Sequence, residues 1–439
     1  MSKLVIRLIT LALSIAMLAG LSVGCGGKED VSSSSGANPL DKAPTGVQSD
    51  VKPQDYAGTE ITFVTWKDPE LSEDGPVVKK FEKDYGIKVN IQLVEQAGYV
   101  KNLAADVASG KQGDIFFENG TFPGSLTVMQ PLDAAKLDLT DPIWNQGIIK
   151  ASTLEGKPYL VDTLSNVWAE VDICVYNKAL FENNNITSPK EYYEAGKWTF
   201  ANMRYAAQQI KNLGSTYVGV ELLGPSALGA AGSTLFKFAD NKFSLNMDAH
   251  YYETMNFFSQ LKADGLGRLG RTDFQNGLTG MAFTNCFGLK KTGYYKKINP
   301  DHLGATFLPK WDENSDHAVT GIYRGWGLID GAKNPVAAGL FLREYLDVNN
   351  YDLEKTFHNE EVANFFFQAT GKYSDNMIYY RSEDLRRTTG LGRLYDDFWN
   401  VYSPSQIRGA LDSEKNTLNL MVEQANKIVE EEIAIIKKG

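Results

Sequence analysis

The 439-residue sequence predicts an α/β protein whose folded part is divided into two domains. Three observations lead to this expectation. Strand and helix patterns alternate along residues 61–117, as in a parallel sheet with helices on its faces. A second alternation begins near Trp168. About 380 residues remain once a polar N-terminal region is set aside, and one hydrophobic core seldom serves a chain of that length.

The first domain begins with a strand-helix-strand-helix-strand series. Apolar and polar residues alternate in residues 61–66 and 87–93, which predicts two strands. Apolar residues recur at helical spacing in residues 78–85 and 99–107, and a glycine ends each of these helices. Residues 114–117 form the expected third strand. Ligands of such sheets bind beyond the carboxyl ends of the strands, so the residues that follow the first and third strands are candidates for a site.

The second domain repeats this alternation with longer connections. Its strands are expected at residues 171–176, 217–222, 280–284, 303–308 and 319–329. Its helices are expected at residues 179–183, 198–213, 251–263 and 335–346, with a further element from 188 and a helical C-terminal third that ends with residues 418–437.

The N-terminus predicts export and a lipid anchor. Lys3 and Arg7 precede a short apolar run at residues 8–19, and small residues follow, which is typical of a secretory signal peptide over residues 1–24. Residues 21–25 resemble a bacterial lipobox, with Ser22 where leucine is usual. We therefore expect lipidation of Cys25. The polar Gly-, Ser- and Pro-containing stretch 25–57 is expected to be a flexible tether.

Composition narrows the possible partners. The net charge is −10, and no basic stripe is present to neutralise phosphates, so nucleic acid is not expected as a ligand. Aromatic residues are plentiful, with 22 Phe, 21 Tyr and 7 Trp. Most are expected in the core, although exported sugar binders also need aromatic faces. If Cys25 carries a lipid, Cys174 and Cys286 remain as either a disulfide or two buried thiols.

Two short motifs resemble a nucleotide-binding loop and a calcium loop, but their sequence context argues against both sites. Residues 265–270 match GxGxxG but follow a helix rather than a strand, so a nucleotide site is not expected. Asp312, Asn314 and Asp316 have the first spacings of a calcium loop, yet the sixth position is His317 rather than glycine, which favours a solvated loop. No metal or other cofactor is expected.

Several motifs in a fixed order resemble the family 1 extracellular solute-binding proteins of ABC importers, which include the maltose-binding proteins. Residues 156–159 (GKPY) and 175–181 (VYNKALF) match its GKxY and YYNKxLF pattern, and residues 186–198 resemble its next segment. Residues 274–281 (FQNGLTGM) match FxxGkxaM, with leucine in place of the usual lysine. Residues 325–335 match its Gly-rich strand and the following KNP.

The resemblance implies a two-lobe periplasmic-binding-protein fold of type II, in which each lobe is a mainly parallel sheet flanked by helices. It places residues 58–164 and 325–360 in the N-lobe and residues 165–324 and 361–439 in the C-lobe. A monomer of this kind closes about hinge crossings on a small molecule, here a mono- or oligosaccharide, and delivers it to the permease subunits of an importer. It acts at the outer face of the cytoplasmic membrane, without a catalytic residue or cofactor.

Candidate ligand-binding residues lie at strand ends and crossings. A sugar needs aromatic faces together with carboxylates and amides that bond its hydroxyls. Arg324 suits a ligand carboxylate equally as well as a hinge salt bridge, and Phe287 aligns with a ligand-stacking position of maltose-binding relatives. The expected set is Trp66, Asp68, Glu118, Asn119, Asp162, Trp168, Glu170, Asn285, Phe287, Tyr323, Arg324 and Trp326.

Two other functions remain open at this point. An extracellular carbohydrate-active enzyme needs two carboxylates flanking the scissile bond. Asp68 and Glu118 are available for that role, but no motif selects a pair. A sensor partner would bind the same ligand and present it to a membrane kinase instead of an importer.

Overall fold

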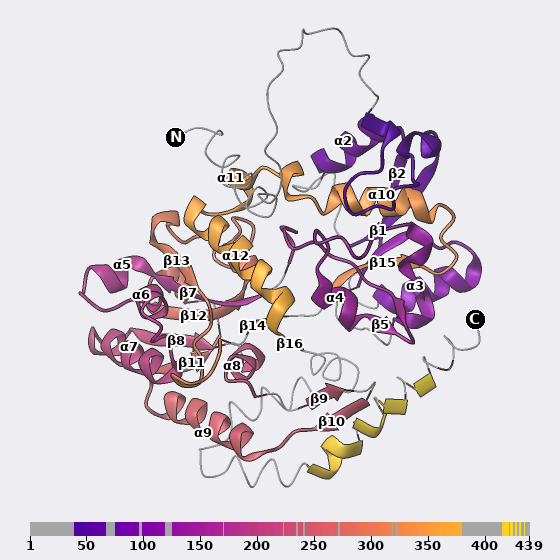
Figure 1. Ribbon diagram of the computed structural model, residues 1–439. Coiled ribbons are helices and arrows are strands. Elements are labelled where there is room, and N and C mark those ends of the chain that lie inside the picture. The colour runs from indigo at the N-terminus through magenta and orange to yellow at the C-terminus, as the bar shows by residue number, and fades with distance from the viewer. Residues whose placement is uncertain are drawn as a thin grey trace, which may run out of the picture. The chain divides into compact units, whose positions relative to one another are not determined.

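A computed structural model describes the protein from residue 39 onward (Figure 1). The ranges it leaves undescribed are 67–74, 96–98, 119–124, 170, 223, 234–235, 240–241, 271–272, 318, 322–323, 380–414, 421, 425, 428–429, 432–433 and 435–439. The signal peptide and Cys25 lie outside the described residues, as do Asp68, Asn119, Glu170 and Tyr323.

The first sheet has the strand order β2-β1-β3-β15-β4. Its strands are β1 (Glu60–Thr65), β2 (Lys88–Leu93), β3 (Ile115–Glu118), β4 (Met129–Gln130) and β15 (Gly325–Ile329). Its main helices are α2 (Gly75–Tyr85), α3 (Tyr99–Ser109) and α10 (Pro335–Tyr345). The predicted strand-helix series is confirmed, and α10 packs beside α2 although about 250 residues separate them in sequence (Figure 1).

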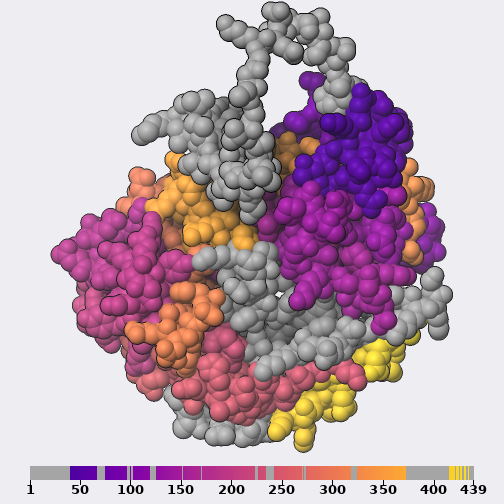
Figure 2. Space-filling view, in the orientation of Figure 1, coloured from indigo at the N-terminus to yellow at the C-terminus, as the bar shows by residue number. Residues whose placement is uncertain are grey.

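The second sheet has the strand order β11-β8-β12-β7-β13. Its strands are β7 (Asp172–Asn177), β8 (Val218–Leu222), β11 (Gly267–Leu269), β12 (Thr279–Asn285) and β13 (Leu303–Thr306). Its main helices are α5 (Lys178–Glu182), α6 (Pro189–Glu194), α7 (Phe200–Asn212), α9 (Ala249–Ala263) and α12 (Glu360–Asn376). Glu361 of α12 pairs with Lys178 and Lys190, and Figure 2 shows α12 in orange beside the magenta surface of α5 and α6.

Both sheets are mixed rather than mainly parallel. In the first sheet β1 pairs in parallel with β2 and β3, but β15 is antiparallel to β3 and β4. In the second sheet β8 is parallel to β11 and β12, but β7 is antiparallel to β12 and β13. The exceptions have one cause: β7 and β15 each enter their sheet directly from the other domain, so no crossover helix fixes a parallel direction.

The strand expected over residues 319–329 is two strands in different sheets. β14 (Val319–Gly321) pairs with β16 (Met377–Tyr379), whereas β15 belongs to the first sheet. Residues 377–379 are also a strand within a region expected to be helical. The apolar pattern continues across the break, and hydropathy alone therefore does not reveal where the chain leaves one domain for the other.

Smaller elements complete the described chain. They are α4 (Gln146–Ala151), β5 (Thr153–Leu154), β6 (Lys157–Pro158), α8 (Gly224–Ala230), β9 (Phe236–Ala239), β10 (Lys242–Leu245) and α11 (Leu353–Thr356). Short 3₁₀ helices lie at Pro39–Asp41, Pro53–Tyr56, Leu126–Val128, Leu132–Ala135, Phe274–Asn276, Cys286–Leu289, Pro300–His302 and Val348–Asn350. Helical residues also recur between 415 and 434.

The tether expected over residues 25–57 is too long at its C-terminal end. Val47 and Val51 are buried in the core of the first sheet. The indole N–H of Trp144 donates to the Gly46 carbonyl at 2.9 Å, and Arg343 donates to the Thr45 carbonyl at 2.6 Å. The composition of this stretch is polar, but these few contacts are sufficient to hold it against the folded body.

The two body cysteines are buried and form no disulfide with each other. Cys174 lies in β7 and Cys286 directly follows β12, and both are fully buried. Burial in apolar surroundings raises the pKa of the Cys174 thiol far above its ordinary value. None of the helices in the described part of the chain combines the length and apolarity that crossing a bilayer requires.

Candidate functional site

Aromatic side chains gather at one edge of the first sheet. Trp66 directly follows β1, and Phe117 is the penultimate residue of β3. Trp326 lies opposite Phe117, because β15 runs antiparallel to β3 and begins where β3 ends. This edge therefore contains the carboxyl ends of β1 and β3 and the start of β15. Ligands of such sheets bind beyond the carboxyl ends of the strands, which is where the sequence predicts a site.

These rings form a continuous series. The centroids of Trp66 and Phe117 are 5.5 Å apart, and those of Phe117 and Trp326 are 4.7 Å apart. Tyr99 packs edge-on against Trp66 at 5.2 Å, and its hydroxyl donates to the Val64 carbonyl at 2.9 Å. Trp66 and Phe117 are partly exposed, whereas Trp326 is buried. The first two rings thus keep surface for a ligand, while Trp326 anchors the series in the core.

One donor in this series lacks an acceptor. The indole nitrogen of Trp326 is buried, and no group among the described residues accepts its hydrogen bond. A buried N–H without a partner is costly, so this atom favours an acceptor such as a hydroxyl oxygen at the sheet edge. Glu118, at the end of β3, is also fully buried there and lies opposite Gly325.

Three segments that pass between the domains are bonded together next to this edge. Val161 and Trp326 exchange two backbone hydrogen bonds of 3.0 and 2.9 Å. The hydroxyl of Thr163 donates to the carbonyl of Leu346, at the end of α10, at 2.9 Å. The crossings therefore meet within residues 161–163, which is where the predicted site residue Asp162 lies.

Asp162 is a buried carboxyl with few compensating contacts. It accepts a hydrogen bond from the Thr163 amide at 2.8 Å, and the Asn166 side chain also stabilises its charge. Burial outweighs both contacts and raises the pKa of Asp162 to about 7. At neutral pH part of the Asp162 population is therefore protonated, and the protonated carboxyl can donate a hydrogen bond as well as accept one.

A second cluster lies at the matching edge of the second sheet. Asn285, the last residue of β12, is paired with Asp172, the first residue of β7, and both are buried. Phe287 follows on the 3₁₀ helix and packs edge-on against Tyr294 at 5.1 Å. The predicted residues Asn285 and Phe287 thus lie where the chain enters the second domain.

Lys290 brings a cation into this cluster. Its ammonium lies 3.5 Å from the ring centroid of Trp168 and 5.7 Å from that of Phe287. Lys290 is almost completely buried, whereas the ring of Trp168 also packs against the core of the first domain. One face of Trp168 is therefore already occupied by a cation, which leaves less of its ring for a sugar than the sequence suggests.

The structure thus brings the described candidates into two groups. Trp66, Glu118, Asp162 and Trp326 lie at the first edge, and Trp168, Asn285 and Phe287 lie at the second. Arg324 directly precedes β15 and is partly buried; its choice between a ligand and a salt bridge stays a prediction.

Phe117 and Lys290 are additions that sequence reasoning missed. Phe117 lies inside an apolar strand, so the sequence does not distinguish it from a core residue. Its pairing with Trp326 places it at the aromatic edge of the first sheet. Lys290 follows the predicted Asn285–Phe287 segment, so a search one helical turn further would have included it.

A comparison with protein-family models identifies the chain. Residues 66–347 match the model of the bacterial extracellular solute-binding proteins. The chain belongs to this family. The matched range includes the whole second sheet, every strand of the first sheet except β1, and both edges described above.

Relatives of this solute-binding protein match it over most of its length. A maltooligosaccharide ABC transporter solute-binding lipoprotein of Streptococcus pneumoniae is 22% identical over 395 residues, covering 84% of this chain and 85% of that protein. The sugar-binding protein MalE of Xanthomonas citri is similar in structure, with a TM-score of 0.62 at 15% identity over 87% of this chain and 100% of that one. A cyclic α-maltosyl-1,6-maltose binding protein of Arthrobacter globiformis has a TM-score of 0.60 at 16% identity, covering 87% of this chain and 99% of that chain. The two-lobe binding-protein fold expected from the sequence is confirmed.

Proposed function

We propose that this protein is the substrate-binding lipoprotein of an ABC importer, and that it binds a mono- or oligosaccharide between its lobes. In this proposal residues 58–164 and 325–360 form one lobe, against which residues 45–57 also pack, and residues 165–324 and 361–439 form the other. Closure about the crossings buries the ligand and changes the surface shown to the permease subunits. Closure requires no chemistry, and we propose no catalytic activity.

The observation that carries the sugar assignment is the aromatic series at the first sheet edge. The rings of Trp66 and Phe117 are partly exposed and are fixed by Tyr99 and Trp326. A pyranose ring presents C–H groups to such faces, while its hydroxyls bond to carboxylates and amides. Glu118 lies beside the rings, and Asp162 is next to the Val161–Trp326 bridge.

The twelve residues predicted from sequence form our proposed ligand site, with two changes. Phe117 joins it for its contact with both tryptophans. Trp168 is given a structural role at the hinge as well as a ligand contact, because Lys290 covers one face of its ring. The names of the relatives, which include maltooligosaccharide and cyclic α-maltosyl-1,6-maltose binding proteins, support an oligosaccharide over a charged small molecule.

Export and anchoring are part of the same proposal. Cys25 carries the lipid, and the protein is a monomer at the outer face of the cytoplasmic membrane. The relative from Streptococcus pneumoniae is named a lipoprotein, which supports this assignment. The tether then spans residue 25 to about residue 44, since Thr45 and Gly46 already bind the folded body.

A thermal-shift panel tests the proposed ligand class. The panel contains mono- and oligosaccharides, with amino acids and polyamines as comparison ligands. A bound sugar stabilises only the folded state, so the melting temperature should rise as its occupancy grows. A shift with a polyamine or an amino acid, and none with any sugar, would overturn the carbohydrate assignment.

A further inference from the structure

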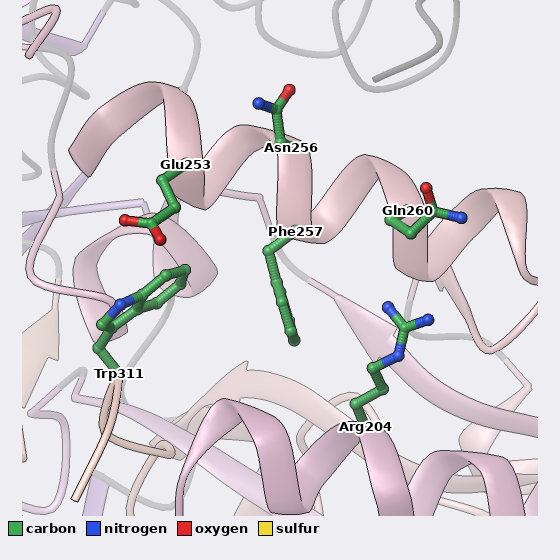
Figure 3. Close-up of a pocket in the computed structure, with 6 residues that line it drawn as sticks. All are labelled: Arg204, Glu253, Asn256, Phe257, Gln260 and Trp311. Carbon is green, nitrogen blue, oxygen red and sulfur yellow. The ribbon is translucent and has the colours of Figure 1, made fainter. Parts of the chain in front are cut away.

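A cavity on the second domain lies apart from the two strand edges. It has a volume of about 470 Å³ and lies between α7, α9 and the loop that contains Trp311 (Figure 3). Its lining residues are Arg204, Glu253, Asn256, Phe257, Gln260 and Trp311. This volume falls within the range of small-molecule sites.

The aromatic part of the cavity is held in place by the core. Trp311 is partly exposed and contacts Phe257 and Phe200 with centroid distances of 5.8 and 5.7 Å. His250 packs edge-on against Trp311 at 5.0 Å. Figure 3 shows Phe257 projecting from α9 between Trp311 and Arg204. Two partly exposed rings therefore form fixed walls.

The calcium-like motif of the sequence explains why Trp311 is so well fixed. Asp312 accepts hydrogen bonds from the amides of Asn314 and Ser315, both at 2.9 Å, and thereby closes a tight turn directly after the tryptophan. On the other side, the backbone of Lys310 bonds to Trp198 and Phe200 at 3.0 Å. Trp311 is thus pre-organised from both directions, as a binding platform requires.

The polar part of the cavity is balanced in charge. Glu253, Asn256 and Gln260 are exposed and lie along one stripe of α9, because they are spaced by three and four residues. Arg204 is already paired with Asp264, which also accepts from Gln260 at 2.7 Å. Fixed aromatic walls beside amides and a carboxylate, with little net charge, suit a neutral ligand rich in hydroxyls.

We propose that this cavity is an auxiliary carbohydrate site that takes one or two units of a neutral saccharide chain. The inference extends the proposed function and rests on it for the class of ligand. A second contact, on the second domain, would keep a long polysaccharide close while shorter pieces are captured, since linked sites raise the effective concentration of one another's ligands.

Affinity electrophoresis of the full chain through gels that contain amylose, pullulan, dextran or galactan tests the proposal. The experiment is done in a Trp66→Ala background, so that retention does not report the proposed interlobe site. We expect at least one polysaccharide to retard the protein and Trp311→Ala to weaken that retardation at least about fivefold. Tyr205→Ala is the matched control, because Tyr205 is an aromatic residue of α7 that is 59% exposed and does not line the cavity.

A second variant guards against misfolding. Glu253→Ala with Asn256→Ala removes two exposed polar groups without touching the core, and we expect it to weaken retention at least about threefold. Retention that is absent for every polysaccharide, or unchanged in both variants, overturns the auxiliary site. The thermal-shift panel with short sugars reports the interlobe site separately, so failure of either proposal is recognised independently of the other.

Discussion

The fold disfavours the charged form of Asp162, because the carboxyl is buried. The folded protein holds its pKa at about 7, against an ordinary value of 3.8. Between these two values the folded chain binds more protons than the unfolded chain, so this residue lowers stability as the pH rises through about 4 to 7. Protonation of Asp162 therefore stabilises the folded state at the point where the domains are joined.

Replacing Asp162 with asparagine should remove this pH dependence. We expect Asp162→Asn to stabilise the protein at pH 8 by roughly 2–4 kcal/mol. Near pH 4 the folded-state carboxyl is protonated and the unfolded-state carboxyl is only partly ionised, so the effect should fall below about 1 kcal/mol. Thermal melts of both proteins at the two pH values measure the difference.

Asp312→Asn is a control, because the pKa of Asp312 is shifted in the opposite direction to that of Asp162. Hydrogen bonds of Ser315 lower the pKa of the exposed Asp312, so its contribution is present at neutral pH and is lost on acidification. An Asp162→Asn variant that is less stable than wild type at pH 8 would contradict the assignment.

The two tryptophans of the aromatic series should respond differently to truncation. Trp66 is partly exposed, so Trp66→Ala should weaken sugar binding at least about tenfold with a small loss of stability. Trp326 is 5% exposed and touches Phe63, Phe117 and Tyr345, so Trp326→Ala should cost about 3–5 kcal/mol of stability. Calorimetric titration and thermal melts separate the two effects. Equal loss of stability in both variants would place Trp66 in the core instead.

At the scale of elements, α7 lies against β8 at a glycine. A Cβ on Gly219 would come within 2.5 Å of the Ala207 Cα and 2.7 Å of its carbonyl oxygen. Gly219→Ala must therefore move the helix or the strand, and we expect a loss of about 1–3 kcal/mol. Gly214→Ala is a matched control with a nearest contact of 3.5 Å, and should change stability by less than about 0.5 kcal/mol. Denaturant unfolding of the two variants makes the comparison, and similar stability in both would show that α7 is loosely packed.

Elements with strong local patterns could be predicted from the sequence, and the join between domains could not. The alternation of Ile61, Phe63 and their neighbours predicts β1, and Gly86 predicts the end of α2, because local periodicity and backbone freedom decide both. The break between β14 and β15 depends on which sheet supplies the next partner. Likewise, the burial of Asp162 and the approach of Lys290 to Trp168 depend on contacts between distant segments, which a single sequence does not contain.

At the scale of the whole molecule, the anchor and the binding body are expected to be separable. Cys25→Ser should release the protein from the membrane fraction, because the signal peptide alone does not hold an exported protein and no other lipid site is proposed. Its melting temperature, and its shift with the sugar identified by the panel, should equal those of the wild-type folded body. Cell fractionation with immunodetection measures the release. A Cys25→Ser protein that stays with the membrane would contradict the lipid assignment and leave the binding function intact.

The burial of the two body thiols has a practical consequence. If Cys25 carries the proposed lipid, the remaining thiols are those of Cys174 and Cys286, and both are fully buried. Burial in apolar surroundings raises the pKa of the Cys174 thiol far above its ordinary value. Oxidants in solution then do not reach either of these thiols, and the two cysteines form no disulfide with each other that an oxidoreductase would have to make. An engineered surface cysteine would be the sole reactive thiol, so a fluorophore or spin label could be placed on either lobe of an otherwise native protein.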